Sequence, residues 1–190
     1  MLDAALAMKI VALTCLLVSV SPVSAQTTFD RAFNREVAAV QDIAVFFSPK
    51  GGCTEAVIAE LGKAKKSVLV QAYSFTSAPI AAALVDAKKR GVDVRVILDK
   101  SQRSERYTSA DFVAHAGIPT FIDAMHAIAH NKVMVIDGQT VVTGSFNFTR
   151  AAEESNAENL LVIHNAGTLA QKYTANWQAH RAHSEAYAGR

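Results

Sequence analysis

The sequence predicts an α/β fold: one domain in which a mixed β-sheet is sandwiched between helices. Short runs rich in Val, Ile and aromatic residues alternate with runs that carry apolar residues at helical spacing, and this alternation is typical of βαβ units. A hairpin pattern in the second half of the chain adds antiparallel strands, so the sheet is expected to be mixed. The length of 190 residues suits one domain.

The first half of the chain alternates predicted strands and helices. Ser77 is suited to cap the second helix, Pro79 fits its first turn, and Gly91 follows its end. The run IAVFFSP, which begins at Ile43, is almost uniformly apolar and predicts a buried strand. The predicted strands are 43–49, 67–76 and 92–99, the predicted helices are 51–66 and 77–90, and the polar residues 100–109 form a loop or the start of a mobile helix.

The second half of the chain contains the hairpin. Gly138 and Gln139 separate two β-type runs, which predicts two antiparallel strands joined by a tight turn. A long amphipathic helix follows, with Leu169, Tyr173 and Trp177 on one apolar stripe. The predicted elements are helix 110–117, strand 118–123, hairpin strands 130–137 and 140–145, strand 156–164 and helix 166–187.

An export signal is predicted at the N-terminus. Met8 and Lys9 precede an apolar run of 11 residues, and Val23 and Ala25 supply the small residues of a cleavage site. A retained membrane anchor is the weaker alternative, because the run is shorter than the ~20 residues of a spanning helix. We expect the mature protein to be periplasmic or secreted, without stable membrane association. The predicted segments are 1–25, a cleaved signal peptide, 26–42, a lead-in, and 43–190, the folded domain.

Charge and cysteine content leave several partners open. The formal net charge of +2 is too small to demonstrate a polyanionic partner, although it does not oppose one. Cleavage after Ala25 would remove Cys15 and leave Cys53. A single cysteine forms neither an internal disulfide nor a cysteine zinc cluster. We therefore expect Cys53 to be a buried thiol, with pairing between two chains as the alternative.

Polar residues of several types gather around the predicted hairpin. Alternate residues of a strand share a face, so His130 and Lys132 are expected to project together. The returning strand brings Ser145 and Asn147 back beside them. A lysine, a serine and an asparagine suit the non-bridging oxygens of a phosphate. A histidine can attack phosphorus or move a proton near neutral pH.

These residues carry a family resemblance. The stretch that starts at His130 resembles the H-x-K-x4-D-x6-G-S-x-N signature of the phospholipase D superfamily. Over essentially all of 43–182, the chain is similar to the small, exported bacterial endonucleases of that superfamily. The resemblance implies a phospholipase D-like fold, with 43–190 as the catalytic domain. The matching positions are His130, Lys132, Asp137, Gly144, Ser145 and Asn147.

The resemblance also implies a phosphodiesterase mechanism without metal or cofactor. His130 would attack phosphorus and form a phosphohistidine, while a second histidine protonates the leaving oxygen. Water, activated by that second histidine, would then hydrolyse the intermediate. Lys132, Ser145 and Asn147 would bind the phosphoryl oxygens and offset the charge of the transition state.

Two carboxylates complete the candidate catalytic set. Glu158 starts an apolar strand that would anchor its side chain, and the family places a supporting glutamate at this position, behind the nucleophile His130. Asp137 corresponds to the aspartate of the signature. Its position in the turn or on the opposite face of the strand indicates that its main role is to fix the hairpin.

The implied mechanism needs two histidines, whereas the chain has one H-x-K motif. A two-fold homodimer that brings His130 of each subunit to one shared site would supply both. The spacing of His126 and His130 imitates a helical zinc pair, but residue 130 begins a predicted strand, so no metal site is expected. The histidines without the motif are His115, His126, His164, His180 and His183.

The predicted function is a metal-independent, sequence-nonspecific endonuclease that acts on double- or single-stranded DNA, with RNA as an open alternative. A phospholipase D-type phosphatidyl hydrolase or transferase would use the same residues. An apolar surface loop would favour that alternative, and the sequence gives no sign of one. A binding protein that keeps the motif by descent is opposed by the intact set of polar residues.

A few residues near these segments have two interpretations. Lys100, Arg103 and Arg106 either contact a nucleic-acid backbone or lie in a solvated loop. Tyr73 and Phe75 are expected in the core of the sheet or at a dimer contact. Neither choice can be made from the pattern alone.

Overall fold

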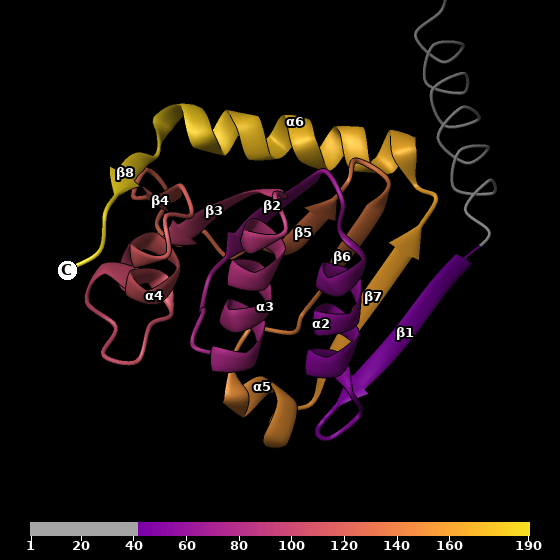
Figure 1. Cartoon of the computed structure of the whole chain (residues 1–190). Coiled ribbons are helices and arrows are strands. Elements are labelled where there is room, and N and C mark those ends of the chain that lie inside the picture. Colours follow the sequence, from indigo (N-terminus) through magenta and orange to yellow (C-terminus); the bar gives the residue numbers. More distant parts are fainter. Residues whose placement is uncertain (1–41) are drawn as a thin grey trace, which may run out of the picture. The chain divides into compact units, whose positions relative to one another are not determined.

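The structure is a computed structural model that describes residues 42–190 (Figure 1). The predicted signal peptide and residues 26–41 of the lead-in lie outside the described residues. Within residues 42–190 the α/β class is confirmed, because one mixed sheet packs helices on both of its faces.

The sheet in the described residues has eight strands. They are β1 Asp42–Ser48, β2 Ser67–Ala72, β3 Asp93–Asp99, β4 Thr120–Asp123, β5 Lys132–Ile136, β6 Thr140–Gly144, β7 Glu158–His164 and β8 Glu185–Tyr187. Their order in space is β1-β7-β6-β5-β2-β3-β4-β8. The strands β2, β3 and β4 run parallel to one another. The remaining neighbours are antiparallel.

Helices cover both faces of this sheet (Figure 1). They are α2 Cys53–Lys63, α3 Ala78–Lys89, α4 Ala110–His115, α5 Arg150–Glu154 and α6 Gly167–His183, with a 3-10 turn η1 at Lys100–Arg103. The helices α2, α3 and α4 share the larger apolar cluster with one face. The helix α6 packs on the other, where Trp177 donates its indole N–H to the carbonyl oxygen of Val70 at 3.0 Å. None of the helices within residues 42–190 is long and apolar enough to cross a bilayer.

The strand directions define one functional edge of the sheet. Because β5 is antiparallel to β2, β5 begins where β2 ends. The same rule places the end of β6 and the start of β7 there, and β3 and β4 end there because they are parallel to β2. We call this the site edge: the ends of β2, β3, β4 and β6 with the starts of β5 and β7. The turn between β5 and β6 lies at the opposite edge.

Some elements depart from the prediction. The first strand was expected to be buried, yet Ile43, Val45 and Phe47 are exposed, because β1 is an edge strand and only its other face meets the core. The strand β2 ends at Ala72 rather than at residue 76. The last helix ends at His183, and the next residues form β8, which pairs with β4.

Cys53 is a buried free thiol at the start of α2, which confirms the expectation for this residue. Burial raises the pKa of the thiol to about 11, and the negative charges of Glu153 and Glu55 add to the effect. A thiol with this pKa is about one part in a thousand thiolate at pH 8, and the thiolate is the reactive form.

We therefore expect Cys53 to resist thiol reagents in the folded protein. In a Cys15→Ser variant, reaction with Ellman's reagent at pH 8 should be at least about a hundredfold slower in buffer than in guanidinium chloride. The measurement is the absorbance of the released thiolate over time. Equal rates in the two solvents would show that Cys53 is accessible and would contradict the buried position.

Candidate active site

Segments that are distant in the sequence meet at the site edge. Tyr73, just after β2, donates its backbone N–H to the carbonyl oxygen of Asn131 at 2.9 Å, and Thr76 donates to that of Phe148 at 3.0 Å. Pairing of β6 with β7 adds the start of β7 to the group. The segments brought together are 73–76, 130–132, 145–148 and 156–159.

His130 and Lys132 lie together at the start of β5. This strand begins at Lys132, so the exposed His130 occupies the preceding loop rather than the strand that was predicted. The ammonium of Lys132 donates to the carbonyl oxygen of His130 at 2.9 Å. The ring of Tyr73 contacts both side chains, with its centroid 4.6 Å from the imidazole centroid and 5.1 Å from Nζ of Lys132. Tyr73 therefore borders the site, while Phe75 is in the core.

Lys132 is a buried cation in this site. The residue is 7% exposed. Burial lowers the pKa of its ammonium, and the negative charge of Glu158 opposes that effect. Within residues 42–190 no carboxylate forms an ion pair with Lys132. A bound phosphate would supply an anion and favour the protonated lysine.

Ser145 presents a hydroxyl group whose O–H is available to donate a hydrogen bond. Its Oγ accepts hydrogen bonds from the backbone N–H of Asn159 at 3.0 Å and from the side-chain amide of Asn159 at 3.3 Å. Both acceptor positions are then used, which leaves the hydroxyl proton to donate to a ligand oxygen. The preceding Gly144 allows this contact, because a Cβ there would lie 2.2 Å from the carbonyl oxygen of Asn159.

Asn147 and Glu158 complete the group at the site edge. The side-chain oxygen of Asn147 is buried without a hydrogen-bond partner in the described structure, and as an acceptor it can be satisfied by a donor group but not by a phosphate oxygen. Glu158 accepts a hydrogen bond from the side chain of Asn156 at 3.2 Å. Within residues 42–190 no hydrogen bond joins Glu158 to His130, so support of the histidine by Glu158 stays a prediction.

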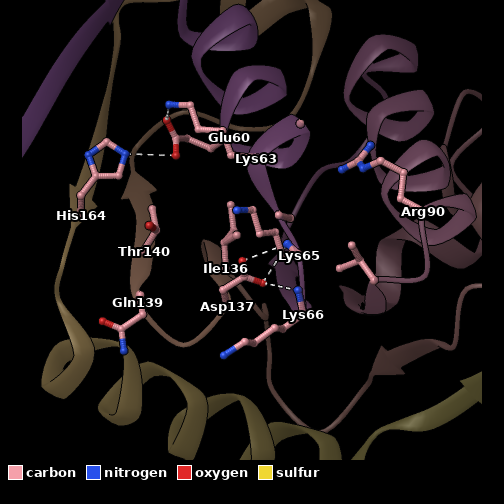
Figure 2. Close-up of a pocket in the computed structure, with 13 residues that line it drawn as sticks. Glu60, Lys63, Lys65, Lys66, Arg90, Ile136, Asp137, Gln139, Thr140 and His164 are labelled. Carbon is pink, nitrogen blue, oxygen red and sulfur yellow. Dashed lines mark hydrogen bonds and ion pairs between the residues drawn. The ribbon is translucent and has the colours of Figure 1, made fainter.

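Asp137 lies at the other end of β5, in the hairpin turn. Its carboxylate accepts backbone N–H groups from Lys65 at 2.9 Å, Lys66 at 2.7 Å and Ser67 at 2.9 Å. It lines a hollow of about 860 Å³ at this opposite edge, with Lys65 and Lys66 beside it and His164 across the hollow (Figure 2). The structure thus separates Asp137 from the other candidate catalytic residues, and its contacts fix the hairpin against the start of β2.

The basic residues after β3 are partly held by contacts within the protein. Lys100 donates to a loop carbonyl oxygen at 3.0 Å, and Arg103 pairs with Glu185. Arg106 lies over the ring of Tyr107, 5.4 Å from its centroid. Lys100 and Arg103 are thus held by contacts within the protein, which neither the nucleic-acid interpretation nor the solvated-loop interpretation predicted.

Comparison with known proteins shows the family and the fold of this chain. Residues 57–181 match the family model described as cardiolipin synthase, PLD-like domain. A phospholipase D of Rickettsia bellii is 41% identical over 140 residues, which are 74% of this chain and 69% of that protein. Nuc from Salmonella typhimurium, a phospholipase D family member, is 40% identical with a TM-score of 0.75, over 77% of this chain and 97% of Nuc. NucT from Helicobacter pylori, 23% identical, shares the fold with a TM-score of 0.69, over 77% of this chain and 99% of NucT.

The fold and the polar group at the site edge define a phosphodiesterase. Both the family model and the Rickettsia relative cover most of the domain, and the motif beginning at His130 contains one of the two histidines and the phosphate-binding side chains that this chemistry is expected to use. The chain belongs to the phospholipase D superfamily, as its motif predicted.

The contacts of Asp137 predict a pH-dependent contribution to stability. Burial opposes ionisation of Asp137, but hydrogen bonds from Ser67, Lys66 and Lys65 outweigh it and hold the pKa below the ordinary 3.8. The stabilisation is therefore complete above about pH 5 and is lost as the pH falls through the lower folded pKa. Asp137→Asn should lower the free energy of unfolding by about 2 kcal/mol at pH 7, or Tm by about 4–8 °C.

Calorimetry at pH 7 and below pH 4 tests this expectation, and the difference from wild type should shrink at the lower pH. Asp86→Asn is the matched control, because the carboxylate of Asp86 is 62% exposed and pairs with Lys89 on the surface at 3.2 Å. Such a surface change is worth less than about 0.5 kcal/mol. An Asp137→Asn variant as stable as this control at pH 7 would refute the assigned role.

Proposed function

We propose that the protein is a metal-independent, sequence-nonspecific endonuclease that hydrolyses DNA phosphodiesters through a phosphohistidine intermediate. The observation that carries the proposal is the exposed imidazole of His130 next to the buried ammonium of Lys132, with a free serine proton at the same sheet edge. Such a set can attack a phosphodiester and hold its oxygens at the same time.

The first step forms a bond between a ring nitrogen of His130 and phosphorus and breaks the bond from phosphorus to the leaving oxygen. A general acid donates a proton to that oxygen as it departs. In the second step water attacks phosphorus, the nitrogen–phosphorus bond breaks, and the conjugate base takes a proton from the water. His130 is then restored, so the cycle consumes one water for each phosphodiester.

Lys132 and Ser145 stabilise the charge that develops on the phosphoryl oxygens. Lys132 contributes a cation whose position is fixed by the strand, and its burial strengthens the attraction because little water screens it. Ser145 contributes a neutral hydrogen bond from its O–H group, and the side-chain N–H of Asn147 can donate another. Glu158 helps to keep Lys132 protonated, in addition to its predicted support of His130.

The general acid is proposed to be His130 of a second copy of the chain. The other histidines are all within the described residues, and none lies in the group around Lys132. His164 contacts Glu60 at 3.0 Å at the opposite edge, and His115 ends α4. Three more surround Asp123 at the end of β4, namely His126, His180 and His183. A homodimer with its axis near the site edge would provide the missing imidazole.

Nucleic acid is the proposed substrate because the chain resembles small exported bacterial endonucleases along nearly its whole folded length. The 40% identity to Nuc, a phospholipase D family member that the chain matches over 97% of the length of Nuc, supports the phosphodiesterase class. The candidate residues address phosphate and no base, so cleavage should not depend on sequence. DNA in either strand form is proposed, RNA is an alternative substrate, and the predicted export signal would place the activity in the periplasm or outside the cell.

A phosphatidyl hydrolase or transferase is the second candidate, and one observation favours it. The loop that leads to His130 exposes two apolar side chains, Met125 at 72% and Ile128 at 55%, although no apolar loop was expected from the sequence. Apolar side chains at the mouth of a site can enter a lipid surface. The Rickettsia bellii relative is likewise named phospholipase D.

A nicking assay on supercoiled plasmid distinguishes the nuclease from the phosphatidyl hydrolase. Wild-type protein in excess EDTA should nick the plasmid, and His130→Asn should reduce the rate by at least about a thousandfold because the nucleophile is gone. Gel electrophoresis measures nicking, and release of choline from phosphatidylcholine vesicles is measured in parallel. Choline release without nicking would favour the phosphatidyl hydrolase and would overturn the nuclease proposal.

Mixed dimers test the shared site. Co-expression of wild-type and His130→Asn chains gives heterodimers with one histidine, which should be inactive. When the two chains are present in equal amounts and pair at random, the specific activity of the total protein should then be about one quarter of the wild-type value. Independent sites in each chain would leave about one half, which would contradict the shared site. A tagged pair that allows the heterodimer to be isolated makes the measurement direct.

A further inference from the structure

A second polar cluster lies at the site edge, around the end of β4. Asp123, which is fully buried, meets three histidines, and one ligand atom from each of the four residues lies within 4.8 Å of every other. Nδ1 of His126 is 3.1 Å and Nδ1 of His180 is 2.6 Å from Oδ2 of Asp123. Nε2 of His183 is 3.3 Å from the same oxygen.

The hydrogen bonds of the Asp123 carboxylate leave one ligand atom of this cluster without a partner. Nδ1 of His180 bonds to Oδ2, and Nδ1 of His126 lies within reach of both Oδ1, at 3.2 Å, and Oδ2, at 3.1 Å. The buried Nε2 of His183 has no hydrogen-bond partner in the described structure. Three imidazoles also crowd together, with ring centroids 4.9–5.4 Å apart. A buried polar atom without a partner costs free energy unless a ligand reaches it.

A divalent transition-metal ion fits the donor set. Zinc binds imidazole nitrogen and carboxylate oxygen at about 2.0–2.2 Å, so neighbouring ligands of a tetrahedral site lie about 3.3 Å apart. Two of the distances from Oδ2 to the three nitrogens, 3.1 and 3.3 Å, are near that value, and the third, 2.6 Å, is shorter and would lengthen on binding. Three neutral imidazoles and one carboxylate also suit zinc better than magnesium or calcium, which prefer oxygen ligands.

We propose that Asp123, His126, His180 and His183 form a zinc-binding site that is separate from the phosphodiesterase site. Four protein ligands close the coordination sphere, which is typical of a structural rather than a catalytic zinc. From the sequence no metal site was expected, since the spacing of His126 and His130 only imitates a zinc pair, and His180 lies 57 residues beyond Asp123, too far for a local pattern to show the site. The proposal does not rest on the proposed nuclease function.

The position of the site shows what bound zinc would stabilise. Asp123 ends β4 and His126 lies in the loop 124–131, whereas His180 and His183 belong to the last turns of α6. The ion would therefore clamp the C-terminal end of α6 to the loop that carries His130. That loop is also held by Asp99, whose carboxylate accepts the backbone N–H of Ala129 at 2.7 Å.

Metal analysis of the full chain tests the site. Protein purified without chelators and supplied with zinc should contain about one zinc per chain by plasma mass spectrometry. After chelation, zinc at a hundredfold excess over its Kd should raise Tm by roughly 5–10 °C, whereas magnesium should not. Protein loaded with cobalt in place of zinc should show the visible absorption of a tetrahedral cobalt ion, and added zinc should displace the cobalt and abolish this absorption.

Variants locate the ligands. His180→Gln combined with His183→Gln should remove the zinc and the zinc-dependent rise in Tm, while His115→Gln, outside the cluster, should keep both. His130→Asn should also keep both, which separates this site from the phosphodiesterase site. Substoichiometric zinc in wild type without any rise in Tm would overturn the proposal, and that result does not depend on folding of a variant. Zinc retained by the double variant would overturn it as well.

Circular dichroism of the chelated protein shows whether it stays folded in EDTA, and this separates the test of the zinc site from the nuclease assay. Nicking by chelated protein that remains folded supports metal-independent cleavage whether or not zinc binds. Loss of nicking together with loss of the folded signal, both restored by zinc, would support the structural site. Loss of nicking by protein that stays folded would contradict the proposal of metal-independent cleavage but not the proposal of a zinc site.

Discussion

The antiparallel pairing of β5 with β2 is the constraint on which the active site depends. Its register sets Lys132 opposite Ala72, at the point where β2 ends and Tyr73 begins. Met134 and Ile136 share the face of Lys132 and are buried in the larger apolar cluster, so a shift by one residue would move them to the face that α6 covers and turn the lysine away. The apolar core thus fixes the position of the charged group, and binding of a phosphate need not order it.

The two polar clusters at the site edge are built around buried charges of opposite sign. Around Lys132, a buried cation has no paired carboxylate within the described residues, and Glu158 acts on it without an ion pair. Around Asp123, burial opposes ionisation of the carboxyl group, yet the hydrogen bonds of His180 and His126 and the nearby His183 lower its pKa. The first arrangement attracts an anion and the second attracts a cation. Their separation on β5 and β4 keeps the two ligands from competing.

Local pattern predicted most of the fold because the strands and helices of this chain carry strong periodicity. It failed where tertiary pairing decides the structure. The three residues of β8 form a strand only because β4 has an unpaired side with which they can pair. The strand β1 is half exposed because it is the outermost strand on the other side of the sheet. Lys132, Ser145 and Asn147 were predictable from the motif, and the fold does bring them together. Tyr73 was not recognised as a site residue, because nothing in its sequence neighbours shows that the segment after β2 contacts His130.

The loop 124–131 links the two clusters, and its order bears on both. His130 lies outside the strand, so the ladder of β5 does not hold it. Its restraints are the contact of its ring with Tyr73, the bond from Tyr73 to Asn131, and the bond from Ala129 to Asp99. Each residue ordered in such a loop costs about 1–2 kcal/mol of backbone entropy. An ion held by His126 would offset part of that cost before substrate arrives, which would pre-organise the nucleophile without contact between the metal and the substrate.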